Sequence, residues 1–296
     1  MLNIPDRAIP FLRARLKKMT ERSEQGLFEK ERASQELLGR FMQKLVRSPI
    51  AEDAIIFDCF SAAMLLPEKT EEKGAVLYLH GGGFCAGDLE YAKWYGKALC
   101  SEINVPVLCP AYRLAPEHRF PAALLDALEA YRWLAERYDA GRIVVIGESA
   151  GGGLAFSLVL KLKELKQPMP AGIVGISPWV DLTQSGASYE TNRDRDPSMT
   201  RMKLCRFAQA YCDDPSDPLA SPLFAEMGAM PDTLLFAGGD EIMMDDAVRM
   251  HEKLTAAGTR CDLVIAPEMW HAYLFYGLQR HGPDRKKIIS FMKEHL

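Results

Sequence analysis

Apolar residues are spaced along the chain in two different ways, and the change of spacing divides the sequence. In the first fifty residues they recur every three or four positions, as on one face of a helix. One such face holds Ile9, Leu12, Leu16 and Met19, and a second holds Leu37, Leu38, Phe41, Met42 and Leu45. These stripes predict helices in the first fifty residues.

From Ala54 onward, short runs of consecutive apolar residues indicate strands. Residues 54–60 and 62–67 are expected to form an antiparallel pair. Six further candidate strands lie at residues 75–80, 105–112, 142–147, 171–177, 233–239 and 261–267. Helical spacing fills most of the gaps and is clearest at 122–138 and 245–257. This alternation predicts a mostly parallel sheet covered by helices on both faces.

Residues 181–222 interrupt the alternation. They are polar, rich in Asp, Ser, Arg and Pro, and hold one helical piece near residues 202–212. Such an insertion is expected over the carboxyl ends of the strands, where open sheets bind ligands. With 296 residues and 48% hydrophobic content, the chain is expected to fold as a single α/β domain carrying this insertion.

Composition excludes several classes of protein. The net charge of −4 argues against a partner nucleic acid, because phosphate binding requires a basic field. The seven cysteines are scattered without a CxxC pair, which disfavours a zinc ribbon or a disulfide framework. No apolar run resembles a signal peptide or approaches the roughly 18 residues of a membrane span. We therefore expect a soluble, cytoplasmic protein.

The basic run at residues 13–18 is most simply a solvated helix face, although it could touch an acidic surface.

Ser149 lies at the junction of a predicted strand and a predicted helix. Residues 147–151 read Gly-Glu-Ser-Ala-Gly, which matches the pattern G-x-S-x-G. A serine in this setting is held in a strained turn with its hydroxyl projecting above the sheet. The flanking glycines are needed because a Cβ there would strike the neighbouring strand or helix. The pattern therefore indicates a nucleophile at Ser149.

A serine nucleophile requires a base, which in this chain order follows the acid. Four histidines follow Ser149, and three of them lie in helical stretches or beside the terminus: His251, His281 and His295. His271 instead follows the strand candidate at 261–267 by four residues. It is the expected base.

The acid is expected after the preceding strand candidate. Asp240 and Glu241 both follow residues 233–239 directly. Neighbouring residues in an extended loop point to different sides, so only one of the two carboxylates can face His271. The spacing leaves both open.

Residues 80–84 read His-Gly-Gly-Gly-Phe and follow another strand candidate. A phosphate loop is the competing interpretation, but the Lys and Ser/Thr of G-x-x-x-x-G-K-[ST] are absent. Consecutive glycines suit a loop whose backbone N–H groups converge on an oxyanion. We expect His80 to orient or pack this loop, because no metal-ligand cluster accompanies it.

These motifs together resemble the hormone-sensitive lipase family of α/β-hydrolases, on its bacterial carboxylesterase and acetyl esterase side. The resemblance runs from about residue 75 to the C-terminus and rests on HGGGF, PAYRLAPEHRFPAALLDA at 110–127, GESAGGG, and ASPL before GGDEIMMDDA. It implies an α/β-hydrolase fold with a mostly parallel eight-stranded sheet flanked by helices. It also implies a helical cap formed by about 1–50 and about 181–222.

The resemblance assigns roles to individual residues. It implies Ser149 as nucleophile, His271 as base, and an oxyanion hole made by the N–H groups of Gly82, Gly83 and Ala150. The usual acid pattern of the family is D-P-L-x-D, with the catalytic carboxylate four residues before the last Asp. When Asp245 is aligned with that last Asp, Glu241 falls at the position of the catalytic acid and Ile242 at the position of the proline. A Glu at the acid position departs from the commoner Asp. We therefore favour Glu241 over Asp240.

The implied activity is that of a serine carboxylesterase that hydrolyses short-chain acyl esters through an acyl-enzyme, without a metal or an organic cofactor. Phe84 and Trp179 are candidates for a substrate pocket that limits acyl length, with core packing as the alternative. The expected partner is a small-molecule ester, and the resemblance suggests a homodimer through a sheet edge. One alternative is an amidase or formamidase with the same triad. Another is a non-catalytic small-molecule receptor, as the plant gibberellin receptors are on this fold, but such receptors typically lose the base.

Overall fold

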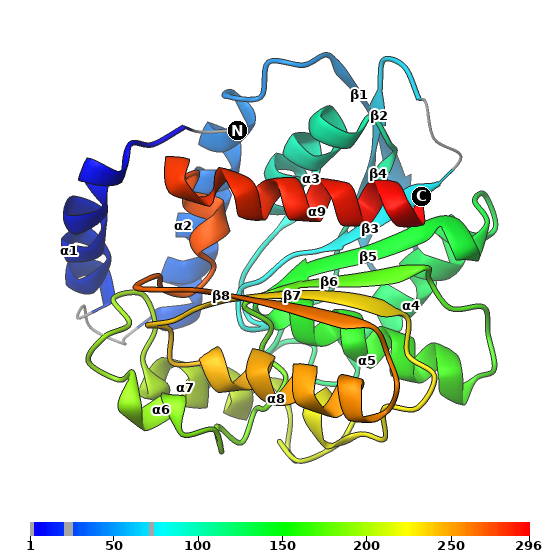
Figure 1. Ribbon diagram of the computed structural model, residues 1–296. Helices are drawn as coiled ribbons and strands as arrows, with labels where there is room; N and C mark the ends of the chain where they lie inside the picture. The colour runs from blue at the N-terminus through cyan, green and yellow to red at the C-terminus, as the bar shows by residue number, and fades with distance from the viewer. Residues whose placement is uncertain (1–2, 21–25, 71–73) are drawn as a thin grey trace.

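The structure, a computed structural model, describes residues 3–20, 26–70 and 74–296, so parts of the expected cap segment 1–50 lie outside it. Within these residues eight strands form one sheet in the order β1-β2-β4-β3-β5-β6-β7-β8 (Figure 1). The strands are β1 (Ile50–Ile56), β2 (Ser61–Pro67), β3 (Ala75–Leu79), β4 (Val107–Ala111), β5 (Ile143–Glu148), β6 (Gly172–Ile176), β7 (Asp232–Gly238) and β8 (Cys261–Ala266). The predicted α/β fold is confirmed, and all six later strand candidates are strands.

The two antiparallel pairings lie at one edge of the sheet. β2 pairs antiparallel with β1 and with β4, and every pairing from β3 to β8 is parallel. The first strand begins earlier than expected, and residues 57–60 form the hairpin turn. That turn is held by a 2.9 Å hydrogen bond from Phe57 N–H to the Phe60 carbonyl and by stacking of the two rings. β8 forms the opposite edge, and the predicted homodimer through a sheet edge stays a prediction.

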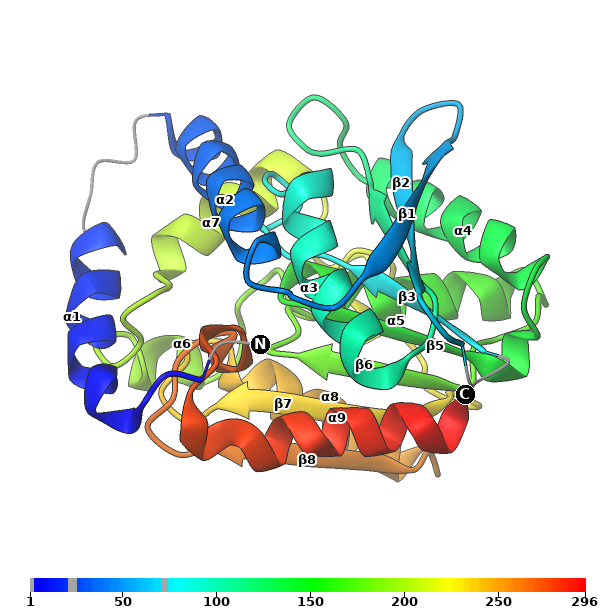
Figure 2. The ribbon, with the colours of Figure 1, turned by 90° about the horizontal axis from the view of Figure 1, so that it is seen from above.

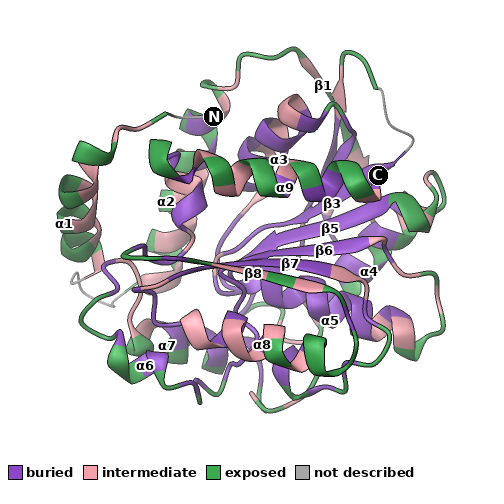
Figure 3. Cartoon of the chain, in the orientation of Figure 1, coloured by how far each residue is buried: buried purple, intermediate pink, exposed green. Residues whose placement is uncertain are grey.

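Helices cover both faces of the sheet, which explains why β3, β5 and β6 are buried along their whole length and, apart from Glu148 at the end of β5, lack charged residues (Figure 3). One face packs against α3 (Leu89–Ile103) and α9 (Gly282–His295). The other packs against α4 (Ala122–Ala135), α5 (Ala150–Glu164) and α8 (Met244–Ala256). The core is therefore divided into two layers by the sheet.

The remaining α-helices lie beyond the carboxyl ends of the parallel strands (Figure 2). They are α1 (Ile9–Thr20), α2 (Leu27–Gln43), α6 (Ser188–Thr191) and α7 (Arg201–Tyr211). Short 3₁₀ helices occupy Asp6–Ala8, Ala140–Arg142, Pro222–Phe224, Tyr273–Tyr276 and Gln279–His281. The described parts of residues 1–50 and the 181–222 insertion thus meet at the end of the sheet where ligands bind in open α/β folds.

The second apolar stripe near the N-terminus is largely exposed. Of its five residues only Met42 is buried. α2 approaches α3 through Gly39, where an added Cβ would lie 2.5 Å from the Glu90 carbonyl oxygen. The side of α2 that holds Gly39 and Met42 therefore faces α3, and the leucines of the stripe face away from the protein.

Over the part of the chain that is described, none of the helices combines the length and the apolar character that a bilayer crossing requires.

Candidate active site

Ser149 lies at a sharp corner between β5 and α5. Its backbone has φ 55° and ψ −122°, a strained conformation for a residue with a side chain. The corner is possible because its neighbours lack side chains. A Cβ on Gly147 would lie 2.2 Å from the Gly151 carbonyl oxygen, and one on Gly151 would lie 2.1 Å from that of Leu79. The sequence therefore folds here into a turn that presents the Ser149 hydroxyl above the sheet.

His271 reaches that hydroxyl from the loop after β8. Its Nε2 lies 2.9 Å from Ser149 Oγ, although 122 residues separate them in sequence. Burial lowers the pKa of His271 to about 3, and the positive charge of Lys203 adds to the effect. The imidazole is consequently neutral at physiological pH, so its free nitrogen can accept a proton from the hydroxyl.

Glu241 approaches the other side of the imidazole. Its Oε2 lies 3.9 Å from His271 Nδ1, which is beyond hydrogen-bonding distance. The same oxygen accepts a 2.6 Å hydrogen bond from the Ser177 hydroxyl and a 3.1 Å bond from Gly238 N–H. These hydrogen bonds lower the pKa of Glu241, but burial has the larger effect and raises it to about 8.

Ser177 was not singled out from the sequence. Its hydroxyl, while donating to Glu241, accepts a 3.0 Å hydrogen bond from Ala272 N–H, next to His271. Ser177 therefore connects Glu241 to the loop that carries His271. Its position directly after β6, at the same end of the sheet as the other site residues, was the only available signal.

Asp240 points away from His271. Its carboxylate forms an ion pair with Arg13 of α1 at 2.7 Å and a second with Arg195. Of the two carboxylates that the spacing left open, Glu241 is therefore the one that the fold turns toward the imidazole, while Asp240 ties α1 to the loop after β7.

The glycine loop after β3 lies beside Ser149. Gly82 and Gly83 have φ values of +121° and +62°, which suit glycine. Within the described residues, neither of their N–H groups donates to another part of the protein. Ala150 is the first residue of α5, and helix geometry leaves its N–H without an intrahelical acceptor. The three N–H groups predicted to form an oxyanion hole are thus available to a ligand.

Two buried side chains support this loop. Glu148, which precedes the serine, accepts a 2.6 Å hydrogen bond from Gly81 N–H and a 2.7 Å bond from the Tyr78 hydroxyl. Burial raises its pKa to about 8. His80 stacks on Tyr112 with ring centroids 4.2 Å apart, and its Nδ1 lies 2.8 Å from the Gly81 carbonyl oxygen. The role of Glu148 was missed, since a residue at the variable position of G-x-S-x-G carries no spacing signal.

Aromatic side chains close the space above the loop. Phe84 stacks on Tyr211 of α7 at 3.8 Å, and its ring centroid lies 6.2 Å from that of Trp179. A Cβ on Gly83 would lie 2.2 Å from the Phe207 ring, so this ring covers the glycine directly. Phe84 and Trp179 are fully packed, so their predicted contact with substrate stays a prediction.

The helices α2 and α7 meet over the site. Lys203 Nζ of α7 lies 2.7 Å from Glu31 Oε1 of α2, and Phe207 stacks on Phe28 at 5.8 Å. Ser149 and His271 are each only 5% exposed as a result.

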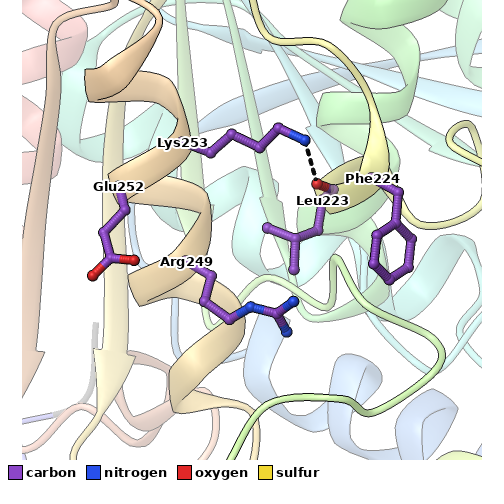
Figure 4. A pocket seen from close by; sticks show the side chains of 5 residues that line it. All are labelled: Leu223, Phe224, Arg249, Glu252 and Lys253. Carbon is purple, nitrogen blue, oxygen red and sulfur yellow. Dashed lines mark hydrogen bonds between the residues drawn. The ribbon is translucent and has the colours of Figure 1, made fainter.

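Two hollows in the described surface are lined by residues other than Ser149 and His271. A shallow one of about 510 Å³ is lined by Leu223, Phe224, Arg249, Glu252 and Lys253. Figure 4 shows Lys253 donating to the Leu223 carbonyl at 2.8 Å, while Glu252 points away. A second of about 230 Å³ is lined by Gly26, Leu27, Phe28, Glu29 and Arg206. Residues 3–20, 26–70 and 74–296 contain no group of three or more His, Cys, Asp or Glu placed to hold a metal ion.

The chain is similar to known hydrolases and esterases. Residues 76–275 match the family described as "alpha/beta hydrolase fold". The chain is 38% identical to the acetyl-hydrolase of Streptomyces hygroscopicus over 227 residues, which are 76% of either chain. It is 32% identical to the ethyl acetate hydrolase of Pseudomonas putida over 235 residues, which are 75% of this chain and 73% of the relative. A crystal structure of an esterase from the bacterial hormone-sensitive lipase family is 31% identical, with a TM-score of 0.86, covering 98% of this chain and 97% of that one.

Proposed function

Because the chain belongs to the hormone-sensitive lipase family of α/β-hydrolases, we propose that it is a serine carboxylesterase acting on short-chain acyl esters. The observation that carries the proposal is the 2.9 Å contact between Ser149 Oγ and His271 Nε2. It joins a nucleophile on a strained corner to a neutral base in a buried site. The names of the relatives, an acetyl-hydrolase and an ethyl acetate hydrolase, favour a short acyl group.

In the first step, Ser149 Oγ attacks the ester carbonyl carbon while its proton passes to His271 Nε2. The carbonyl π electrons move to oxygen, and the N–H groups of Gly82, Gly83 and Ala150 donate to the resulting oxyanion. Each such donor is typically worth about two to three orders of magnitude in rate. The oxyanion then collapses to a carbonyl and the bond to the alkoxy oxygen breaks, while the imidazolium gives its proton to that oxygen, so that an acyl-enzyme and a free alcohol result.

Glu241 stabilises the imidazolium and orients its ring. The 3.9 Å separation between Glu241 Oε2 and His271 Nδ1 has to shorten for a direct hydrogen bond. Catalytic hydrogen bonds often tighten only when substrate is bound, so the long contact is compatible with this role. Ionisation of His271 also favours ionisation of Glu241, because opposite charges nearby stabilise each other.

In the second step, water replaces the alcohol. His271 accepts a proton from the water molecule, whose oxygen attacks the acyl carbon, and the same N–H groups hold the second oxyanion. Collapse of this intermediate breaks the bond to Ser149 Oγ, which recovers its proton from His271. The products are a carboxylic acid and the free enzyme, and each step uses only groups of the chain and water.

We further propose that the described parts of residues 1–50 and 181–222 act as a cap over this site. The low exposure of Ser149 and His271 supports this role, as does the ion pair between Lys203 and Glu31 above them. The packed rings of Phe84 and Trp179 would then limit the space for the acyl chain.

The proposal is tested by treating the protein with a p-nitrophenyl phosphonate and by assaying p-nitrophenyl esters from C2 to C12. We expect a covalent mass increase on the peptide that contains Ser149, and faster hydrolysis of C2 to C4 than of C12 esters. Ser149→Ala should abolish both, whereas Ser157→Ala removes a buried serine hydroxyl that bonds only within α5 and should preserve them. Inertness of the folded wild type toward every activated ester would favour a receptor, and faster cleavage of anilides than of esters would favour an amidase.

A further inference from the structure

The outward side of α2 and the turn that follows it expose an apolar stripe to solvent. Leu37, Leu38, Phe41 and Leu45 follow one another at helical spacing and are 71%, 44%, 59% and 39% exposed. Single exposed apolar residues are normal, but a contiguous group of this kind marks a contact surface. Arg40 of the helix, with Lys44 and Arg47 just after its end, is also exposed, and we call these seven residues of α2 and the following segment the α2 outer face.

The charge of the chain is unevenly distributed. Residues 1–50 contain eleven Lys and Arg against six Asp and Glu, a net charge of +5, so the other 246 residues carry −9. Arg40 forms an ion pair with Glu36, but no acidic residue occurs from 37 to 51, so Lys44 and Arg47 add uncompensated charge to the face. The neighbouring α1 exposes three more cations, Arg15, Lys17 and Lys18.

We propose that the α2 outer face docks on an anionic lipid surface. A helix with Leu and Phe flanked by Lys and Arg lies in the plane of a membrane interface, with its apolar side chains inserted and its cations near anionic headgroups. A second copy of the chain is a poorer occupant, because a symmetric interface would bring the cations of both copies together. The combination of exposed apolar side chains with local positive charge therefore selects the lipid.

The opposite side of the same helix contacts the candidate active site. Arg32 Nε donates to the Cys85 carbonyl at 2.7 Å, just beyond the glycine loop, and Phe28 stacks on the Phe207 ring that covers Gly83. Docking through the outer face would consequently hold the site close to the lipid–water interface.

The test is flotation of the full chain with vesicles, a measurement that does not depend on hydrolysis. The vesicles are pure phosphatidylcholine, or phosphatidylcholine with about 30% phosphatidylglycerol. We expect wild type to bind the anionic vesicles at least about tenfold more tightly than the neutral ones, and to be released by salt. The double variant Leu37→Ser/Phe41→Ser should lose binding about tenfold or more, and Lys44→Glu/Arg47→Glu should lose the preference for anionic lipid.

Leu125→Ser is the matched control, because Leu125 is also an exposed leucine, 46% accessible, on a helix distant from this face. Its binding should equal that of wild type. Circular dichroism and hydrolysis of a water-soluble ester show whether each variant is folded. Absence of wild-type binding to anionic vesicles, or equal binding by Leu37→Ser/Phe41→Ser, would overturn the proposal. So would a concentration-dependent dimer in sedimentation that this double variant abolishes, since a second copy would then cover the face.

Discussion

The Ser177 hydroxyl donates a 2.6 Å hydrogen bond to the Glu241 carboxylate and thereby holds an acid that is still 3.9 Å from His271. A serine at the end of the neighbouring strand thus holds the Glu241 carboxylate.

Replacing Ser177 by alanine is expected to weaken catalysis more at pH 7 than at pH 9. The hydroxyl lowers the pKa of Glu241, so its loss raises that pKa further and leaves the carboxyl protonated to a higher pH. We expect kcat/KM at pH 7 to fall about tenfold, the usual cost of a hydrogen bond to a charged group. The measurement is the pH profile of ester hydrolysis, with Ser157→Ala as control. A uniform loss at all pH values would contradict this role.

Glu241 and Asp240 are expected to differ sharply although they are adjacent. Glu241→Gln should lower kcat by up to about ten-thousand-fold, as loss of the acid does in other triads. Asp240→Asn removes ion pairs to Arg13 and Arg195 outside the imidazole contact, so kcat should change by less than about threefold. Steady-state kinetics of the two variants decide between the carboxylates, and a larger loss in Asp240→Asn would reverse the assignment.

Lys203→Met is expected to move the acidic limb of kcat/KM to higher pH. The positive charge of Lys203 disfavours the imidazolium and so helps to lower the pKa of His271, and its removal should let that pKa rise. Methionine keeps an apolar chain of similar length against the Phe207 ring. Lys253→Met is the control, because Lys253 bonds the Leu223 carbonyl away from the site. An unshifted limb would exclude the electrostatic effect.

Phe207→Leu is expected to shift the preferred acyl chain toward greater length. The Phe207 ring covers Gly83 and stacks on Phe28, which lines the neighbouring hollow of about 230 Å³. A smaller side chain should therefore open space toward that hollow. The ratio of C8 to C2 hydrolysis should rise about fivefold or more. Phe224→Leu, at a 37% exposed phenylalanine, should leave it unchanged. An unaltered ratio in Phe207→Leu would show that this ring does not limit the acyl group.

Much of the fold and part of the candidate site were predictable because they depend on neighbours in the chain. Apolar runs and helical spacing predicted the later strands and the helices between them, since burial on both faces of a parallel sheet requires such runs. The corner at Ser149 was predictable because glycine on both sides is a local steric requirement. His271 could be selected from the histidines by its distance from a strand end.

The spacing of residues along the chain did not predict the direction of side chains or the contacts between distant segments. The motif favoured Glu241, but the position of its carboxylate depends on Ser177, which is 64 residues away in sequence. Glu148 supports the glycine loop across 67 residues, and the Phe207 ring reaches Gly83 from the insertion. The apolar stripe of α2 predicted a helix correctly but not which side would be buried. Gly39 and Met42 face α3 because Gly39, which has no side chain, allows the backbones of α2 and α3 to approach closely. The larger side chains of the stripe then remain on the outside. Local spacing sets the secondary structure, whereas the packing of elements far apart in the chain selects which side chains meet.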